Sequence, residues 1–249
     1  MKNLTKFSGL VSLRGHHFYA NLINHNSIVV DLGSHLGEFS HQISTLAGCK
    51  CYAIEALPSL YVKIQETPLV KKFNNAISLS NQPVKFGVTD NPEFNHIDKW
   101  SVDNVIETIT VEGISLESFM QEQHIQSIDL LKMDIEGAEI DLFQSLSDAS
   151  ICRIKQITVE FHDFIFPIAT EVKFIKNRLK KLGFYCIVFS KKHNGDVLFL
   201  NKKYCNIPII YFIYIRFFAK YVRGISRILN RFFDKNNQFT SKKRGENLS

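Results

Sequence analysis

The sequence predicts an α/β fold with a mostly parallel, seven-stranded sheet whose last strand runs in reverse. From residue 28 to residue 182, short apolar segments alternate with amphipathic ones, and this alternation is typical of a doubly wound parallel sheet. The pattern then changes, because FYCIVFS and DVLFLN are separated only by KKHNG. The Asn194-Gly195 pair favours a tight turn. We therefore expect the last two strands to form an antiparallel hairpin.

The elements follow in chain order. Strands are expected near residues 28–32, 50–55, 70–77, 128–133, 154–161, 184–190 and 196–201. Helices are expected near residues 37–47, 58–66, 115–124, 137–147 and 168–182. Residues 81–113 are less regular, and QPVKFGV and ETITVEG within them are compatible with a small β excursion above the ligand site.

Composition limits the classes of function. The 249 residues are 45% hydrophobic and carry a net charge of +6, so the chain is long and apolar enough to bury a core. Residues 216–249 hold nine Lys or Arg against two acidic residues. The positive charge therefore belongs to the tail, and the rest of the chain gives no reason to expect nucleic-acid binding.

Cysteine usage and the N-terminus indicate a cytoplasmic protein. The five cysteines show no C-x-x-C pattern, which favours reduced thiols, and no apolar signal-peptide core is present. We divide the chain into an N-terminal extension (residues 1–27), an α/β domain (28–204), a basic amphipathic helical tail (205–233) and a polar, disordered C-terminus (234–249).

The segment from Ile28 to Glu55 indicates a site for a nucleoside cofactor. The strand IVVDL leads into a loop with Gly33 and Gly37, and the next strand ends on Glu55. Glycines at such a turn let backbone N–H groups approach a ligand, and an acid about 20 residues further on accepts hydrogen bonds from ribose hydroxyls. Gly33 and Glu55 are 22 positions apart, so the spacing fits.

The glycine spacing favours S-adenosylmethionine (SAM) over a nicotinamide dinucleotide. The loop reads G-x-x-x-G, with Ser34 and His35 inside it, and lacks the middle glycine of the pyrophosphate fingerprint. A pyrophosphate would meet the side chain of His35. A methionine moiety needs less room, and its ammonium group can pair with the carboxylate of Asp31. A nicotinamide-dependent oxidoreductase and an ordinary two-glycine turn remain as alternatives.

A second informative stretch, SIDLLKMDIEGAEIDLF, places Lys132, Asp134 and Glu136 at the carboxyl end of a strand. Ligands of open α/β sheets lie beyond these ends, so the acidic side chains should lie over the reactive end of the cofactor. A carboxylate in the first turn of the next helix also interacts well with the helix dipole. We interpret Glu139 in this way and leave both readings open for Glu136.

The segment ITVEFHDF brings Glu160 and His162 to the end of the following strand. The two side chains share a face if the strand continues, because they are two residues apart. A histidine beside a carboxylate is a reasonable general base for a hydroxyl group. A histidine in a solvated or structural role is the alternative.

Several of these segments together resemble one family. DLGSHLGEFS, IEALP, NNAIS, LLKMDIEGAEIDLF, VEFHD and DVLFLN are similar to the FkbM family of SAM-dependent methyltransferases, from about Ile28 to Asn201. The K-x-D-x-E-G-x-E string is the most specific part. The resemblance implies a Rossmann-like class I methyltransferase fold and O-methylation, commonly of a sugar hydroxyl in a glycan or glycolipid. The family often has Ala and Asn where this chain has Ser34 and His35.

The motifs and the resemblance together predict roles for individual residues. The expected cofactor-binding residues are Asp31, Gly33, Ser34, Gly37, Phe39, Glu55, Ala56, Asn75, Ala76 and Asp134. The expected catalytic residues are Lys132, Asp134, Glu136, Glu160 and His162. Hard oxygen ligands at Asp134, Glu136 and Glu160 would suit Mg²⁺, but the sequence leaves the use of a metal open. For a sugar acceptor, the candidate stacking aromatics are Phe94, Trp100, Phe161, Phe164 and Phe166.

The tail predicts an amphipathic helix on an anionic membrane surface. The apolar run at residues 207–215 is well short of the ~20 residues that cross a bilayer. Basic residues at 216, 220, 223, 227 and 231 then alternate with aromatic and aliphatic ones over the rest of residues 207–233, as in interfacial helices. Attachment would place the protein on the inner face of the membrane, in polysaccharide biosynthesis. The alternatives are a helix packed on protein and a non-catalytic, membrane-associated SAM-binding module.

Overall fold

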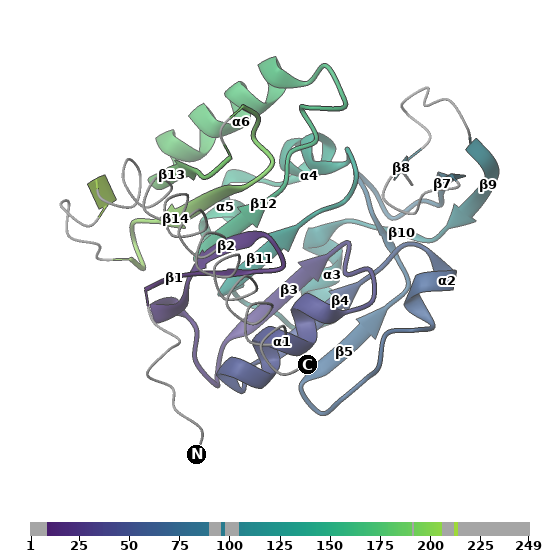
Figure 1. Ribbon diagram of the computed structural model, residues 1–249, viewed down its shortest axis with the longest axis horizontal. Coiled ribbons are helices and arrows are strands. Elements are labelled where there is room, and N and C mark those ends of the chain that lie inside the picture. The colour runs from purple at the N-terminus through teal and green to yellow at the C-terminus, as the bar shows by residue number, and fades with distance from the viewer. Residues whose placement is uncertain (1–8, 90–95, 98–104, 191, 206–211, 214–249) are drawn as a thin grey trace, which may run out of the picture. The chain divides into compact units, whose positions relative to one another are not determined.

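The computed structural model describes residues 9–89, 96–97, 105–190, 192–205 and 212–213. Its centre is a seven-stranded sheet in the order β13, β14, β12, β11, β3, β4, β5 (Figure 1). In chain order these strands are β3 (Ile28–Leu32), β4 (Lys50–Ile54), β5 (Val70–Phe73), β11 (Leu130–Met133), β12 (Gln156–Val159), β13 (Phe184–Val188) and β14 (Val197–Asn201). Each of the seven expected strands contributes to this sheet.

The last strand is reversed, as predicted. The five strands from β5 to β12 pair in parallel, whereas β14 is antiparallel to both of its neighbours, β12 and β13. The hairpin connection is longer than a tight turn at Asn194-Gly195, because β13 ends at Val188 and β14 begins at Val197. The Phe189 N–H donates to the Asp196 carbonyl at 2.9 Å and closes this connection.

The helices are α1 (Glu38–Ala47), α2 (Pro58–Tyr61), α3 (Leu116–Glu122), α4 (Glu139–Ser145), α5 (Asp148–Cys152) and α6 (Ala169–Lys181), with a 3-10 turn, η2 (Ala20–Leu22). α5 was not expected, and two of the expected helices differ in extent. The helix predicted over 58–66 is a single turn. The helix predicted from residue 137 starts at Glu139, because Glu136 and Gly137 have φ values of 50° and 94°, which an α-helix cannot contain.

Helices cover both faces of the sheet (Figure 1). Val30 and Leu131 belong to a core shared with α3, α4 and α6, whereas their neighbours Val29 and Leu130 belong to a second core with Phe39 of α1. Side chains alternate between the two faces of a strand. A strand covered on both faces must therefore be apolar throughout, which explains the continuous apolar runs.

Two small sheets lie beyond the central one. Their strands are β6 (Ala76–Ile77), β10 (Gly113–Ile114), β7 (Val84–Thr89), β8 (His96–Ile97) and β9 (Val105–Val111). β7 pairs with β8 and β9 in a three-stranded antiparallel sheet, which confirms the β excursion within residues 81–113. β6 pairs with β10 rather than with the central sheet, so the strand expected over 70–77 is divided in two.

A β-hairpin packs on the same face as α1. It consists of β1 (Leu10–Leu13) and β2 (His16–Tyr19), joined by Arg14 and Gly15 with φ values of 49° and 91°. Two positive φ values in a row are typical of a type I′ turn. The Tyr19 N–H donates to Oε1 of Gln156 at 2.8 Å, and Gln156 Nε2 donates back to the Tyr19 carbonyl. These bonds tie the hairpin to β12. The hairpin lies within residues 1–27, which the sequence predicted to be an N-terminal extension.

The predicted tail helix (205–233) and C-terminus (234–249) lie outside the described residues, apart from Cys205 and residues 212–213. Phe94 and Trp100 lie outside them too. Among the helices that the structure describes, none is long and apolar enough to span a membrane. All five cysteines are free thiols.

Candidate functional site

A cavity of about 270 Å³ lies at the carboxyl ends of β3, β4 and β11. The expected cofactor-binding residues that line it are Gly33, Ser34, Phe39, Glu55, Ala56, Asn75, Ala76 and Asp134. Lys132 and Glu136 line it as well. Asp31 and Gly37 are not part of its wall, and neither are Glu160 and His162, whose surroundings are described below.

Gly33 lets the first loop pack against the end of β11. Its φ is +70°, and a Cβ atom there would lie 1.7 Å from the Asp134 carbonyl oxygen. The N–H groups of Gly33 and Ser34 both donate to the Ile54 carbonyl, at 3.0 and 3.1 Å. Contrary to the expectation from the sequence, these two N–H groups thus bond to β4 instead of facing a ligand.

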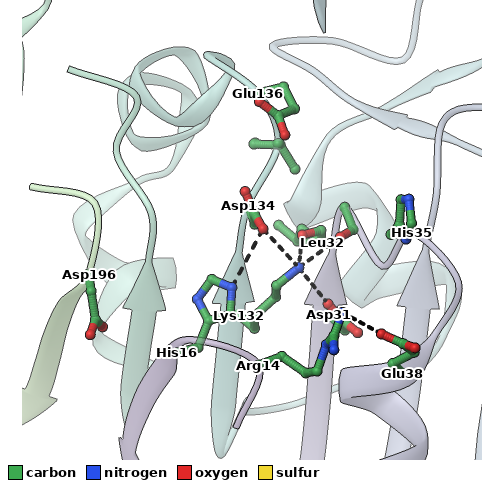
Figure 2. Close-up of polar contacts among 12 residues, drawn as sticks. Arg14, His16, Asp31, Leu32, His35, Glu38, Lys132, Asp134, Glu136 and Asp196 are labelled. Carbon is green, nitrogen blue, oxygen red and sulfur yellow. Dashed lines mark hydrogen bonds and ion pairs between the residues drawn. The ribbon is translucent and has the colours of Figure 1, made fainter. Parts of the chain in front are cut away.

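Lys132 holds the loop from below (Figure 2). Its ammonium donates to the Gly33 carbonyl at 2.7 Å and lies 3.1 Å from Oδ1 of Asp31 and 3.8 Å from Oδ2 of Asp134. Burial alone would lower the pKa of Lys132, but the two carboxylates outweigh it and raise that pKa above its usual value. Lys132 is therefore a permanent cation that positions the loop and cannot act as a base.

Asp31 is fully buried, and its ammonium partner is the side chain of Lys132. Its Oδ2 also accepts a hydrogen bond from Ser40 Oγ at 2.6 Å. The sequence suggested the cofactor's ammonium as the partner of Asp31. The structure instead places this carboxylate beneath the cavity, where it fixes the charge of Lys132.

His162 was a candidate base, and its surroundings contradict that role. Nε2 lies 3.1 Å from Oε2 of Glu136, and Nδ1 lies 3.0 Å from Oε1 of Glu139. Burial lowers the pKa of His162, but the hydrogen bonds to Glu136 and Glu139 raise it to about 11. At neutral pH the ring is thus an imidazolium that already holds its proton.

Glu139 is a site residue that the sequence reasoning interpreted only as a helix-dipole charge. It is fully buried, and its carboxylate accepts hydrogen bonds from the N–H groups of Ile135 and Gly137 at 3.1 Å. Together with His162 it fixes the loop between β11 and α4, including the left-handed backbone at Glu136. Its place in the K-x-D-x-E-G-x-E string was the signal that could have identified it.

Asp134 lies between two histidines and beside the ammonium of Lys132. His16 Nε2 is 3.5 Å from its Oδ2, and His162 Nε2 is 3.7 Å from its Oδ1. Figure 2 shows the contact between His16 and Asp134. Burial would raise the pKa of Asp134, but Lys132, His16 and His162 lower it well below its usual value. Asp134 is therefore ionised throughout the working pH range. Reasoning from the sequence missed His16, because a long-range contact of the hairpin brings it here.

The charge of Glu160 changes near neutral pH. Burial, and after it the negative charge of Asp134, raise the pKa of Glu160 to about 7. Ligand atoms of Glu160, His16 and Asp134 lie within 4.8 Å of one another. β12 ends at Val159, so Glu160 and His162 are loop residues rather than neighbours on one strand face. Glu160 is the remaining candidate base of the pair.

Glu55 lies in the cavity wall at the end of β4. Its two oxygens accept hydrogen bonds from the N–H groups of His35, at 2.7 Å, and Leu57, at 3.0 Å. Burial raises the pKa of Glu55, and these two bonds oppose the rise. The carboxylate ties together the loops that follow β3 and β4, and each oxygen keeps a further lone pair for a ligand.

The sheet order, the reversed β14 and a cavity at the strand ends define a class I SAM methyltransferase-like fold. The sequence profile of the methyltransferase FkbM domain matches residues 31–186. The chain belongs to the FkbM family of SAM-dependent methyltransferases.

Three known proteins are similar over part of their length. A 48-residue stretch, 19% of this chain and 2% of the other, is 40% identical to the AMB antimetabolite synthetase AmbE of Pseudomonas aeruginosa. The methyltransferase FkbM of Methylobacillus flagellatus is 10% identical over 72% of this chain and 44% of its own, with a TM-score of 0.45. Aeropyrum pernix fibrillarin with bound SAM is 11% identical over 79% and 71%, with a TM-score of 0.38. The chain thus spans less than half of the first two.

Proposed function

We propose that the protein transfers the methyl group of SAM to a hydroxyl oxygen of a sugar, with Glu160 as the general base. The observation that carries the proposal is a carboxylate with a pKa near 7 next to the cavity at the strand ends. A base is most effective when its pKa lies near the working pH. Glu160 meets this condition, whereas Lys132 and His162 keep their protons.

The cavity fits the cofactor in two respects. Ser34 Oγ is buried in its wall without a hydrogen-bond partner, which is the state expected of a group that bonds to a ligand. Glu55 offers carboxylate oxygens for ribose hydroxyls. When bound, SAM supplies an electrophilic methyl group, and the protein supplies alignment and a base.

The catalytic residues then have separate tasks. Glu160 accepts the proton of the acceptor hydroxyl as the oxygen attacks. Asp134 and Glu136 keep fixed positions beside it, because His162 and Lys132 neutralise them. Preorganised charges of this kind need no rearrangement during the reaction. Glu139 orients His162 and is a positioning residue.

The exposed side chain of Phe164 favours an acceptor that contains a ring. Its side chain is 46% exposed, whereas Phe161 and Phe166 are buried in the core. A Cβ atom on Gly195 would lie 3.7 Å from Oε1 of Glu160 and 3.8 Å from Cε1 of Phe164. Glu160 and an exposed aromatic ring therefore flank the same place, and aromatic rings offer an apolar face for one side of a sugar.

The function is tested with SAM carrying an isotopic label in its methyl group. The full chain is incubated with glycan, glycolipid and small-molecule extracts, with and without Mg²⁺ and a chelator, and products are analysed by mass spectrometry after hydrolysis. We expect labelled O-methyl sugars. A label found only on nitrogen or carbon would overturn the O-methylation proposal, and loss of the label with chelator would indicate a metal.

Glu55→Gln is expected to weaken binding of the nucleoside portion. A hydrogen bond to a charged acceptor contributes about 1.5 to 3 kcal/mol, so the dissociation constant of S-adenosylhomocysteine should rise by roughly one to two decades. 5′-Methylthioadenosine, which keeps the ribose, should lose affinity to the same degree. Calorimetry with both ligands measures the effect. Unchanged affinities would refute the ribose contact of Glu55.

We further propose that residues 207–233 attach the protein to anionic membranes. The support is the charge pattern of the sequence, since each basic side chain near such a surface contributes about 1 kcal/mol. At low salt the full chain should float with anionic liposomes but not with neutral ones. A chain ending at Asn206 should remain in the soluble fraction with both. Equal behaviour of the two chains would assign the segment to packing on protein.

A further inference from the structure

Four exposed lysines gather at one end of the central sheet. Lys180 and Lys181 end α6, and Lys202 and Lys203 directly follow β14. The Lys202 N–H donates to the Gly183 carbonyl at 3.1 Å, so the fold brings the two pairs together. Figure 1 shows α6 beside β13 and β14. We call these four residues the lysine surface.

The lysine surface and the cavity lie at opposite ends of the sheet. β14 is antiparallel to β12, and its last residue, Asn201, pairs with the first residue of β12, Gln156. The cavity lies at the carboxyl ends of the parallel strands. A strand of five residues such as β3 is roughly 16 Å long. A partner that covers the lysine surface therefore leaves the cavity open.

The positive charge of the lysine surface is not neutralised within the described part of the chain. The ion pairs of lysine that the structure describes belong to Lys132 and Lys155. Two tyrosine rings lie beside the free ammonium groups. Nζ of Lys202 is 5.0 Å from the ring centroid of Tyr185, and Nζ of Lys203 is 5.4 Å from that of Tyr204. Tyrosine has an apolar body and a polar tip, which suits the headgroup region of a bilayer.

The continuation of the chain indicates which anionic partner the surface meets. The Cys205 N–H donates to the Asn201 carbonyl at 3.2 Å, which fixes the end of the described domain next to Lys202 and Lys203. Two residues later the segment 207–233 begins, and two residues span at most about 7 Å. The Debye length is about 8 Å at physiological salt. A membrane that binds the start of this segment is therefore within electrostatic reach of the lysine surface.

We propose that the lysine surface docks on anionic lipid headgroups together with residues 207–233, so that the cavity faces away from the bilayer. The inference rests on the membrane attachment proposed above. Stable attachment takes two weak signals rather than one, and the four lysines alone are one such signal. This agrees with the expectation that a chain ending at Asn206 stays in solution. The acceptor sugar then enters the site from the aqueous side.

Two variants of the full chain test the proposal. The surface variant replaces the four residues of the lysine surface by Gln. The matched control replaces four exposed lysines elsewhere by Gln, namely Lys63, Lys85, Lys173 and Lys192. Each variant lowers the net charge from +6 to +2, because four positive charges are removed. Partitioning is measured on phosphatidylcholine vesicles with and without phosphatidylserine.

The surface variant should bind the vesicles that contain phosphatidylserine at least tenfold more weakly than the native chain, since each lysine near an anionic surface contributes up to roughly fivefold. The control should stay within about twofold of the native chain, because its lysines lie beyond the Debye length from the membrane. High salt should reduce the difference between the variants. Both should bind S-adenosylhomocysteine as the native chain does, which shows that they are folded.

Hydrogen exchange of the native chain tests the orientation. Vesicles with phosphatidylserine should slow amide exchange in peptides that cover residues 180–184 and 201–205, because lipid headgroups then exclude water from this end of the sheet. Exchange in residues 33–38, at the cavity, should not change. Slower exchange at the cavity without a change at the lysine surface would reverse the proposed orientation and overturn it.

An equal loss of binding in the two variants would show that only net charge matters, and unchanged binding in the surface variant would remove its role altogether. Release of the native chain from the vesicles by double-stranded DNA of equal total charge would make the surface a nucleic-acid site instead. A native chain that binds no vesicles would refute the attachment through residues 207–233 itself. That failure is therefore distinguishable from failure of the lysine surface alone.

Discussion

Gly33→Ala should abolish detectable cofactor binding and lower the free energy of unfolding by about 2 to 5 kcal/mol, from positive-φ strain and overpacking together. The reason is the 1.7 Å approach of an added Cβ to the Asp134 carbonyl oxygen. Backbone atoms lie on both sides of this contact, so either the loop or the end of β11 must move. Denaturant unfolding and calorimetry with S-adenosylhomocysteine measure the two effects.

Gly183→Ala is the matched control. Gly183 also has a positive φ, +90°, but a Cβ atom there meets nothing within 4 Å. In this variant the free energy of unfolding should fall only by the cost of a left-handed backbone at alanine, about 1 to 2 kcal/mol. The variant should bind the cofactor normally. If Gly33→Ala lost no more stability than Gly183→Ala and still bound S-adenosylhomocysteine, the packing role of Gly33 would be wrong.

Glu160→Gln is expected to lower kcat by about 10² to 10⁴, the usual contribution of a general base. Glu160 is not part of the cavity wall, so the affinity for S-adenosylhomocysteine should stay the same. Initial rates with labelled SAM and an accepted acceptor measure the loss. Glu122→Gln, the same change at an exposed position of α3, should have no effect.

The pH dependence separates a base from a structural residue. The carboxyl of Glu160 has a pKa of about 7, and only its ionised form can accept a proton. The native rate should therefore rise as the pH increases through about 7 and then level off. In Glu160→Gln this rise should be absent from the remaining activity. A rise of unchanged shape in the variant would assign the ionisation to another group.

The fold was largely predictable because its signals are local. Alternation of apolar segments predicted the parallel strands, and the short link before Asp196 predicted the reversed hairpin. The predicted bounds of strands were wrong where a side chain bonds to the backbone and ends the strand. Asn74 donates to the carbonyls of Glu55 and Ala56 at 2.9 Å, and β5 ends just before it. No periodicity in the sequence reveals such a bond.

The site was only partly predictable, for a related reason. The carboxyl-end rule placed Lys132, Asp134 and Glu136 at the cavity, because it depends on topology alone. The protonation of His162 depends on Glu136 and Glu139, which lie in the segment before it in the chain, Glu139 by 23 residues. Likewise His16 reaches Asp134 only because the hairpin packs on the sheet. Contacts between distant segments decide these charges, and one sequence does not show such contacts.

The most direct test of the account is calorimetry of the full chain with S-adenosylhomocysteine and, separately, with NAD⁺. A cavity with Ser34 and Glu55 in its wall and a loop without the middle glycine should bind S-adenosylhomocysteine at a single site and should not bind NAD⁺. Binding of NAD⁺ without binding of S-adenosylhomocysteine would contradict the assignment of the cofactor and, with it, the proposed reaction.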